Sequence, residues 1–390
     1  MANEQTILCL NVGSSSCKFS IFDRDDKLVL SGEAARIGLD GGSLTMRTAD
    51  GRKTDQQRNF KGIAEALDAL VDETQRATTL TADAVGHRVV HGGLNHAAPE
   101  RITPELVADL KRLIPYDELH MPGAIAGIEA ITKRMPEQPQ VACFDTAFHR
   151  RMPLVAERFA LPRALYDEGL RRYGFHGISY EYIVHSLGPN PPRRIIIAHL
   201  GNGASMAAIR DGVGIDTTMG FTPTGGFMMG TRSGDLDPGV LLYLLKVKEM
   251  NARELENLVD HHAGLLGVSD LSSDVKTLLE KRRAEPAADL AIKIFCYQIR
   301  KQIGAFAAAL GGLDLLIFTA GIGERAPEIR SEVCAELEHL GIVLDAEKNG
   351  LNSDTISSIA SRCIVRVIRT NENLMIARHT RALISTEGRS

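Results

Sequence analysis

The chain has 390 residues, of which 44% are hydrophobic, and a formal net charge of −4 at pH 7. This length and apolar content suffice for a large core and favour two domains. The slightly acidic balance, without a long basic run, argues against a nucleic-acid surface. A site for an anion in this chain would therefore be a local basic pocket.

The six cysteines are scattered without a Cys-x-x-Cys pair, which argues against a disulfide framework or a structural zinc site. The amino-terminal residues lack the basic stretch of a signal peptide. The longest apolar stretch, 303–322, is broken by Gly311, Gly312 and Asp314, so it predicts a helix end and a buried strand rather than a membrane span. We expect a cytoplasmic protein with no membrane segment.

In chain order, a strand, polar loop, strand and turn open the sequence, and the same plan returns near the midpoint. In both copies the first loop glycine precedes the turn aspartate by ten residues, from Gly13 to Asp23 and from Gly201 to Asp211. The repeat predicts two related domains, each opening with a β-meander whose first turn is a phosphate-sized loop. The expected strands are 6–10, 18–22 and 28–30 in the first copy, and 195–198, 204–209 and 213–219 in the second.

Helix signals fill most of the remaining chain. Capping residues or an initial proline predict helices that begin at Pro104, at Ser179 (running through Leu187) and at Pro238. The later elements are expected as a helix over 286–310, a strand over 313–319, a loop over 320–324 and a helix over 327–340. Alternating strands and helices predict α/β domains with ligands in the cleft between them.

The stretch 200–239 contains ten glycines and carries Arg232 in a glycine-flanked loop. Glycine lets backbone N–H groups converge on an anion, so the stretch indicates phosphate handling. Residues 225–231 resemble a P-loop, but Arg232 stands after Thr231 and the P-loop lysine is missing. Three glycine-rich loops that follow strands (11–16, 199–203 and 320–324) together favour nucleotide binding.

Several other polar clusters carry chemistry. His87 and His91 have the spacing of a zinc helix, but Val89 and flanking glycines favour a strand or loop, so metal binding is not expected there. Arg88 is a better candidate for gripping a carboxylate or phosphate as a bidentate fork. Asp145 follows an apolar strand, and His176 precedes a helix start where it could share an oxyanion.

Taken together, these motifs resemble the acetokinase family of acyl-phosphate-forming carboxylate kinases, nearly from end to end. The resemblance is carried by Asn11-Val-Gly-Ser-Ser-Ser, Gly-His-Arg88-Val-Val-His-Gly-Gly, Phe-Asp145-Thr-Ala-Phe-His, Tyr-Gly-Phe-His176-Gly, His199-Leu-Gly-Asn-Gly-Ala-Ser, Gly-Thr-Arg232-Ser-Gly-Asp, Ala-Gly-Ile-Gly-Glu324 and Asn-Glu372-Asn. It implies the two-domain, actin-like ATPase fold of the sugar kinase/Hsc70/actin type, with one domain at 1–148 completed by about 376–390 and the other at 149–375. It also implies a homodimer.

The same resemblance implies roles for individual residues. Asp145, His176 and Arg232 match catalytic positions, and Asn11 and Glu372 match positions that bind Mg²⁺, with Mn²⁺ as an alternative. The substrate positions, including the acyl pocket, are Arg88, Val90, Leu119, Phe175 and Pro223. The ATP positions are Lys18, His199, Leu200, Gly201, Asn202, Gly203, Asp274, Val275, Lys276, Gly321, Ile322, Gly323, Glu324 and Arg325.

The implied reaction is reversible phosphoryl transfer from ATP to acetate, giving acetyl phosphate and ADP by direct in-line attack. A carboxylate is already ionised at neutral pH and needs no base, so we expect Asp145 to orient Arg88, Arg232 or a metal-bound water. The chain departs from the family at Met121, at Thr224 and Gly225, at Val275 and Lys276, and at Arg325. These departures leave open a propionate or longer-acid kinase and a donor other than ATP. A non-kinase actin-like ATPase is a third alternative.

Overall fold

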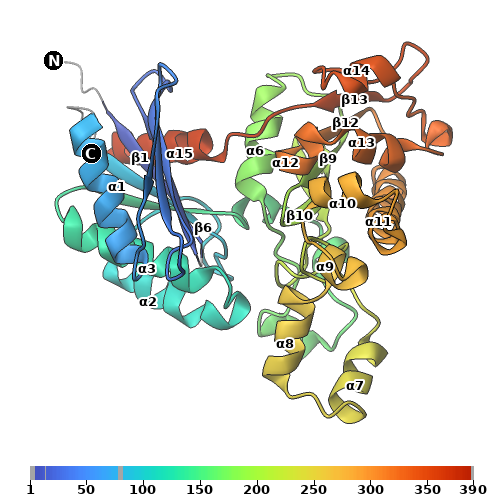
Figure 1. Ribbon diagram of the computed structural model, residues 1–390, viewed down its shortest axis with the longest axis horizontal. Helices are drawn as coiled ribbons and strands as arrows, with labels where there is room; N and C mark the ends of the chain where they lie inside the picture. The colour runs from blue at the N-terminus through green and yellow to red at the C-terminus, as the bar shows by residue number, and fades with distance from the viewer. Residues whose placement is uncertain (1–4, 14, 78–81, 388–390) are drawn as a thin grey trace. The chain divides into compact units, whose positions relative to one another are not determined.

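The computed structural model describes residues 5–13, 15–77 and 82–387, and Figure 1 colours them along the chain. The chain forms two compact units, each built on its own sheet. Unit 1 comprises Met1–Ala147, Gly177–Tyr182 and Asn371–Ser390, and unit 2 comprises Phe148–His176 and Ile183–Thr370. None of the helices within the described ranges combines the length and apolarity that a membrane span requires.

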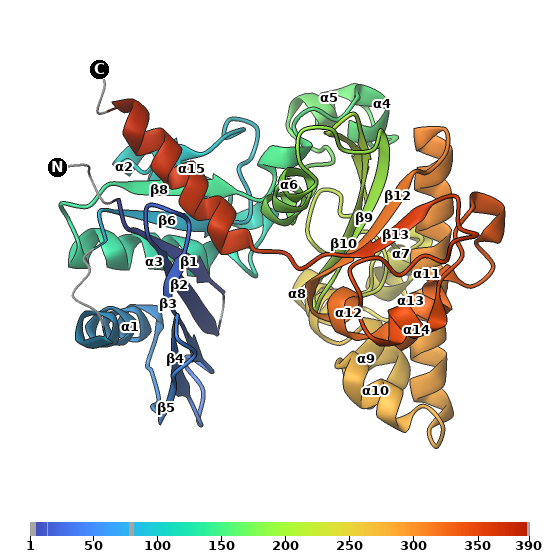
Figure 2. The same ribbon diagram turned by 90° about the horizontal axis from the view of Figure 1, so that it is seen from above.

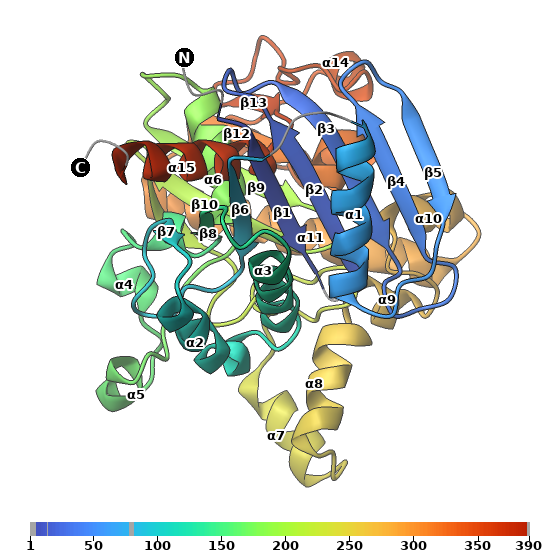
Figure 3. The same ribbon diagram turned by 90° about the vertical axis from the view of Figure 1, so that its left-hand side faces the viewer.

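Unit 1 contains an eight-stranded sheet in the order β5-β4-β3-β2-β1-β6-β8-β7. Its strands are β1 Ile7–Val12, β2 Ser16–Phe22, β3 Leu28–Ala35, β4 Ser43–Thr48, β5 Lys53–Gln57, β6 Ala84–Val89, β7 Glu100–Arg101 and β8 Gln140–Phe144. Its helices are α1 Ile63–Ala77, α2 Pro104–Arg112, α3 Met121–Arg134 and α15 Glu372–Glu387, with the first part of α6 Gly177–Ser186. Figure 3 shows α1 and α3 in front of one face of this sheet.

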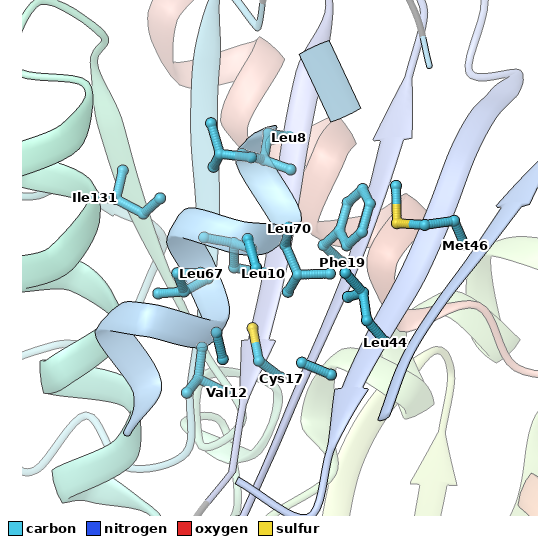
Figure 4. Close-up of a cluster of buried hydrophobic side chains, with 14 of the residues drawn as sticks. Leu8, Leu10, Val12, Cys17, Phe19, Leu44, Met46, Leu67, Leu70 and Ile131 are labelled. Carbon is cyan, nitrogen blue, oxygen red and sulfur yellow. The ribbon is translucent and has the colours of Figure 1, made fainter. Parts of the chain in front are cut away.

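Alternation along β1 gives the sheet of unit 1 two buried faces. Leu8 and Leu10 pack in a cluster with residues of α1, and Figure 4 shows these side chains pointing toward one another. Ile7 and Cys9 pack on the other face against α15, which Figure 2 shows on the side opposite α1. Successive side chains of a strand point to opposite faces, so one strand supports both layers. The core therefore fixes the strand ends of this sheet from both sides.

Unit 2 contains a five-stranded sheet in the order β11-β10-β9-β12-β13. Its strands are β9 Arg194–Leu200, β10 Ala204–Arg210, β11 Val213–Thr217, β12 Leu315–Thr319 and β13 Ile364–Val367. Its helices are α4 Leu154–Glu157, α5 Arg163–Asp167, α7 Pro238–Lys246, α8 Ala252–His261, α9 Gly264–Ser269, α10 Val275–Lys281, α11 Pro286–Leu310, α12 Ala320–Arg325, α13 Pro327–Cys334 and α14 Ala346–Gly350, with the remainder of α6. Short 3₁₀ turns lie at Ile114–Tyr116 in unit 1, at Ala147–His149 where the chain passes from unit 1 to unit 2, and at Glu338–Leu340 in unit 2.

The predicted repeat of two meanders is confirmed, and it extends further than the sequence indicated. Strands β1-β2-β3 and β9-β10-β11 are both antiparallel meanders. On the other side of its first strand, the sheet of unit 1 continues with two parallel strands, β6 and β8. The sheet of unit 2 continues in the same way with β12 and β13. The order β3-β2-β1-β6-β8 thus matches β11-β10-β9-β12-β13 in sequence and direction.

Several predicted helix boundaries are confirmed. Thr103 caps α2 by accepting a hydrogen bond from Leu106 N at 3.2 Å, and Asp237 caps α7 ahead of Pro238. The long helix α11 occupies 286–310, and Gly311 ends it in the left-handed conformation with φ +72°.

Three local predictions are wrong. Residues 320–324 were expected as a loop but form most of α12, because Ala320 takes a left-handed φ of +64° and lets a helix start directly after β12. The helix expected from Ser179 begins at Gly177, with His176 rather than a serine at its N-cap. The helix from Pro327 ends at Cys334, since Ala335 is extended, and 338–340 is a separate 3₁₀ turn.

Candidate active site

In unit 1, Arg88 and Asp145 lie at the same edge of the sheet. Arg88 is near the end of β6 and Asp145 directly follows β8, and these strands are parallel neighbours. Arg88 Nε donates to both carboxylate oxygens of Asp145 at 3.1 and 3.0 Å, and Arg88 Nη2 donates to Oδ2 at 2.5 Å. Because Asp145 is fully buried and Arg88 is largely so, this pair is shielded from solvent and held in a fixed geometry.

The charge on Arg88 is strongly favoured by its surroundings. Burial by itself lowers the pKa of the guanidinium, but the carboxylates of Asp145 and Glu372 outweigh it and raise the pKa above its ordinary value. Asp117 adds to this effect. Sequence reasoning missed Asp117, which lies in no motif that we recognised, and its Oδ1 accepts from His120 N at 3.2 Å.

The two residues predicted to bind the metal both lie beside Arg88. Its Nη1 is 3.5 Å from Asn11 Oδ1 and 3.9 Å from Glu372 Oε2. Asn11 is on β1, and Glu372 is the first residue of α15. Lys18 is the cross-strand partner of Asn11, and its exposed Nζ lies 3.7 Å from Glu33 Oε1. Unit 1 thus gathers oxygen acceptors around one fixed cation, the Arg88 guanidinium.

In unit 2, His176 and His199 stack on each other. Their ring centroids are 4.1 Å apart and their planes differ by 13°. His176 Nδ1 lies 2.8 Å from Ser205 Oγ. A Cβ atom at Gly203 would lie 3.5 Å from His176 Nε2 and 3.4 Å from Arg232 Nη1, so both groups face this glycine. Arg232 Nη1 also donates to Pro223 O at 3.1 Å.

The predicted acyl-pocket residues belong to both units. Val90 follows β6 and is buried, and Leu119 is half-buried between the 3₁₀ turn at 114–116 and α3. Phe175 and Pro223 are buried in unit 2. Phe175 O is 3.0 Å from His149 Nε2, which fixes the backbone directly before His176.

The predicted nucleotide segments of unit 2 meet at the turn after β9. A Cβ atom at Gly230 would lie 2.6 Å from Asn202 Oδ1 and 3.3 Å from Ser273 O, so the segment before α10 reaches this turn. On the other side, the Cβ position of Gly201 is 3.8 Å from the Ala320 side chain at the start of α12. Glu324 stabilises that start by accepting from Ala320 N at 3.0 Å.

The other residues predicted to bind ATP lie at the start of α10, at the end of β9 and on α12. Asp274 caps α10 by accepting from Thr277 N at 3.0 Å, whereas Lys276 is exposed and lies 4.0 Å from Glu280. Val275 is buried. Leu200 ends β9 and is buried, and Gly321, Ile322, Gly323 and Arg325 lie on α12.

The prediction that His87 and His91 do not sit on a zinc helix is confirmed. His87 is on β6, its Nε2 lies 2.8 Å from Gln140 Oε1, and burial lowers its pKa to about 4. Within the part of the chain that the structure describes, no group of three or more His, Cys, Asp or Glu side chains could hold a metal ion.

Comparison with known proteins gives consistent matches over nearly the whole chain. A sequence profile of the Acetokinase family matches residues 6–378. A relative from Methylocella silvestris named acetate kinase is 44% identical, covering 97% of this chain and 98% of its own length. The crystal structure of Porphyromonas gingivalis acetate kinase has a TM-score of 0.87 at 38% identity, over 97% of this chain and all of that one. A propionate kinase from Francisella tularensis has a TM-score of 0.92 at 34% identity, over 97% and 99% of the two chains.

These matches confirm the predicted actin-like α/β fold and the prediction of a kinase that transfers a phosphoryl group to a carboxylate. The predicted resemblance is likewise confirmed, because it extends over the same motifs and almost the same length. On its sequence and its fold, the chain belongs to the acetokinase family.

Proposed function

We propose that this protein is an acetate kinase that transfers the γ-phosphoryl group of ATP reversibly to acetate. The observation that carries the proposal is the buried Arg88–Asp145 pair, because it presents a permanently charged guanidinium at a sheet edge. Such a group suits an anionic acceptor. One acetate oxygen attacks the γ-phosphorus, the bond from phosphorus to the bridging oxygen breaks, and ADP leaves with that electron pair.

Asp145 acts as a positioning group in this proposal rather than as a base. Acetate is ionised at neutral pH and has no proton to lose. Both carboxylate oxygens of Asp145 are engaged by Arg88, so the carboxylate stabilises the guanidinium and fixes its plane. The substrate carboxylate would then meet a preorganised cation instead of a mobile side chain, which lowers the entropic cost of alignment.

His176 and Arg232 stabilise the charge on the transferring phosphoryl group. Their Nε2 and Nη1 atoms face the same glycine, Gly203, which has no side chain to cover them. Donors aimed at the position where negative charge develops are the main means by which phosphoryl transfer is catalysed. The ATP phosphates would approach along the turn 201–203, with α12 and the segment before α10 beside it.

The oxygen atoms of Asn11 and Glu372 suit Mg²⁺, with Mn²⁺ as an alternative. They lie 3.5 and 3.9 Å from Arg88 Nη1, and Mg²⁺ typically takes only one or two protein oxygens together with substrate phosphates. When bound, the ion would neutralise phosphate charge. Asn11 is held on a central strand and Glu372 at a helix start, so both ligands come from rigid elements.

Acetate is the proposed acceptor, and propionate is the second candidate. Two observations favour propionate as this second candidate: a matching structure is named a propionate kinase, and Thr224 and Gly225 depart from the family pattern next to Pro223. One methylene changes binding by only about 1–3 kcal/mol, so a single pocket can accept both acids.

Trapping the acyl phosphate with hydroxylamine tests the function directly. The protein is incubated with ATP, Mg²⁺ and acetate, propionate or butyrate, and the hydroxamate is measured. We expect the highest kcat/KM with acetate. A higher kcat/KM with propionate would make the second candidate the function, and ATP hydrolysis without any hydroxamate would leave an actin-like ATPase.

We also propose a homodimer in the cytoplasm, formed through α7. This nine-residue helix has no buried residue, although Leu242, Tyr243 and Leu245 are apolar. The helix contacts α8 within the chain, but these three apolar side chains are exposed and offer a face for a second copy. An antiparallel pair of α7 helices would place Lys246 of one copy beside the acidic start of the other at Asp237.

Sedimentation of Leu242→Asp tests this interface. We expect a monomer, whereas the wild type and the exposed control Leu351→Asp should sediment as dimers. A dimeric Leu242→Asp protein would place the interface elsewhere.

A further inference from the structure

The backbone at His176 is strained where the side chain is needed. His176 is the N-cap of α6 and has a left-handed φ of +56°, a conformation that is strained for a non-glycine residue. The preceding Phe175 carbonyl is fixed by His149 at 3.0 Å. The chain thus holds the imidazole at this place at a cost in backbone energy.

Two neighbouring strands then hold the ring from different directions. His199 on β9 and Ser205 on β10 are cross-strand partners, so their side chains lie on the same face of the sheet of unit 2. The His199 ring lies against the face of the His176 ring, with centroids 4.1 Å apart. Ser205 Oγ meets the edge of the same ring at Nδ1, at 2.8 Å. A stack restricts tilt and a hydrogen bond restricts rotation, so the two contacts together leave one orientation.

The opposite edge of the His176 ring faces the turn 201–203, which the Arg232 side chain also reaches. The Cβ position of Gly203 is 3.5 Å from His176 Nε2 and 3.4 Å from Arg232 Nη1. Nε2 is therefore the His176 nitrogen that faces this turn, and whether it can donate to a phosphoryl oxygen there depends on whether it carries a proton. In a neutral imidazole one nitrogen donates and the other accepts, and the partner of one decides the state of the other.

We propose that Ser205 is a positioning residue for the phosphoryl transfer: its hydroxyl donates to His176 Nδ1 and so keeps the proton of the neutral imidazole on Nε2. His199 is the platform that keeps the ring in plane for this bond. The inference rests on the proposed kinase function and assigns a role to a fully buried serine that the sequence left without one. It follows the logic by which a fixed partner on one histidine nitrogen selects the tautomer used for catalysis.

Histidine ¹⁵N chemical shifts test the hydrogen bond without any turnover. In wild-type protein at pH 7.5, the His176 signal, assigned from its loss in His176→Gln, should show an acceptor Nδ1 and a protonated Nε2. A protonated Nδ1 at this pH overturns the proposal. Because this readout needs no substrate, it separates the proposal from the proposed function: a protein that makes no hydroxamate could still show the predicted tautomer.

A double-mutant cycle tests the consequence for catalysis. Ser205→Ala should lower kcat about tenfold with little change in the KM values, the size expected for one oriented hydrogen bond. Ser205→Thr, which keeps the hydroxyl, should recover most of the loss. In the His176→Ala background, Ser205→Ala should have no further effect, and an equal loss there would contradict the proposal.

A matched control is available in the same unit. Ser361 Oγ is also hydrogen-bonded within the protein, to Gly341 O at 2.9 Å and Cys363 O at 2.6 Å. Ser361→Ala should leave the His176 ¹⁵N shifts and kcat unchanged, so a loss of kcat in both serine variants would indicate a general packing effect and overturn the specific role. If Ser205→Ala does not fold, Ser205→Thr and the wild-type spectrum still decide the question.

Discussion

The two sheets share five strands of the same order and direction, yet the corresponding strand ends carry different chemistry. Counted from the first loop glycine, Asn11 on β1 corresponds to His199 on β9. On the neighbouring strand β6, His87 pairs with Leu10, so the next residue, Arg88, lies at the level of Asn11. On β12, Thr319 pairs with His199 and therefore occupies the corresponding position in unit 2. Unit 1 therefore has an amide and a guanidinium where unit 2 has an imidazole and a hydroxyl. A repeated backbone can therefore carry different chemistry in its two copies, because strand ends fix positions and leave side chains to specify chemistry.

The strongest test of this contrast is the carboxylate that holds Arg88 in unit 1. Asp145→Asn removes the charge that fixes the guanidinium and should lower kcat/KM for acetate by about 10²–10³-fold. The hydroxamate assay measures this effect, and a thermal melt controls for folding. Near-normal turnover would mean that Arg88 needs no charged partner and would end the positioning role of Asp145.

The corresponding test in unit 2 is Gly203→Ala. The new methyl group would lie 3.4–3.5 Å from Arg232 Nη1 and His176 Nε2, which is ordinary contact, so the fold should tolerate it. It would nevertheless cover both donors, and we expect kcat to fall about 10–10²-fold. Gly304→Ala, in open space on α11, is the control and should retain full activity. Full activity of Gly203→Ala would place the phosphoryl group away from this turn.

Each unit also buries a neutral histidine, and these should govern acid stability. Burial lowers the pKa of His87 in unit 1 and of His149 in unit 2 to about 4, below the unfolded value of about 6.5. Between these pH values the unfolded chain binds more protons, so the free energy of unfolding should decrease as the pH falls from 6.5 to 4.

Urea unfolding at pH 7 and pH 5 measures this decrease. His87→Gln should lower stability at pH 7, since it disturbs the pairing with Gln140, but its loss between pH 7 and pH 5 should be smaller than in the wild type. An unchanged pH dependence would show that His87 does not contribute.

The smallest expected effect is on the free energy of unfolding, through the junction of β12 and α12 at Ala320. Ala320 has a left-handed φ of +64°, which glycine adopts without strain. Ala320→Gly should therefore raise the free energy of unfolding by about 0.5–1 kcal/mol. Urea unfolding of both proteins decides this point, and a clear destabilisation would mean that contacts of the Ala320 methyl outweigh the strain.

The sequence by itself determined the fold class, the repeated meanders and most helix starts. Alternation of apolar residues, glycine turns and caps such as Thr103 and Asp237 act over a few residues, so they can be read locally. It also identified Arg88, Asp145, His176 and Arg232 by their motifs. The family resemblance then connected these motifs to a single reaction.

The tertiary structure alone decided which of these residues support one another. Asp145 is 57 residues from Arg88, and Ser205 is 29 residues from His176, and only the pairing of strands brings each pair together. The helix α12 escaped prediction for the same reason: its start depends on the strained Ala320, held by Glu324 and the end of β12. Local propensity cannot show a conformation that distant contacts impose.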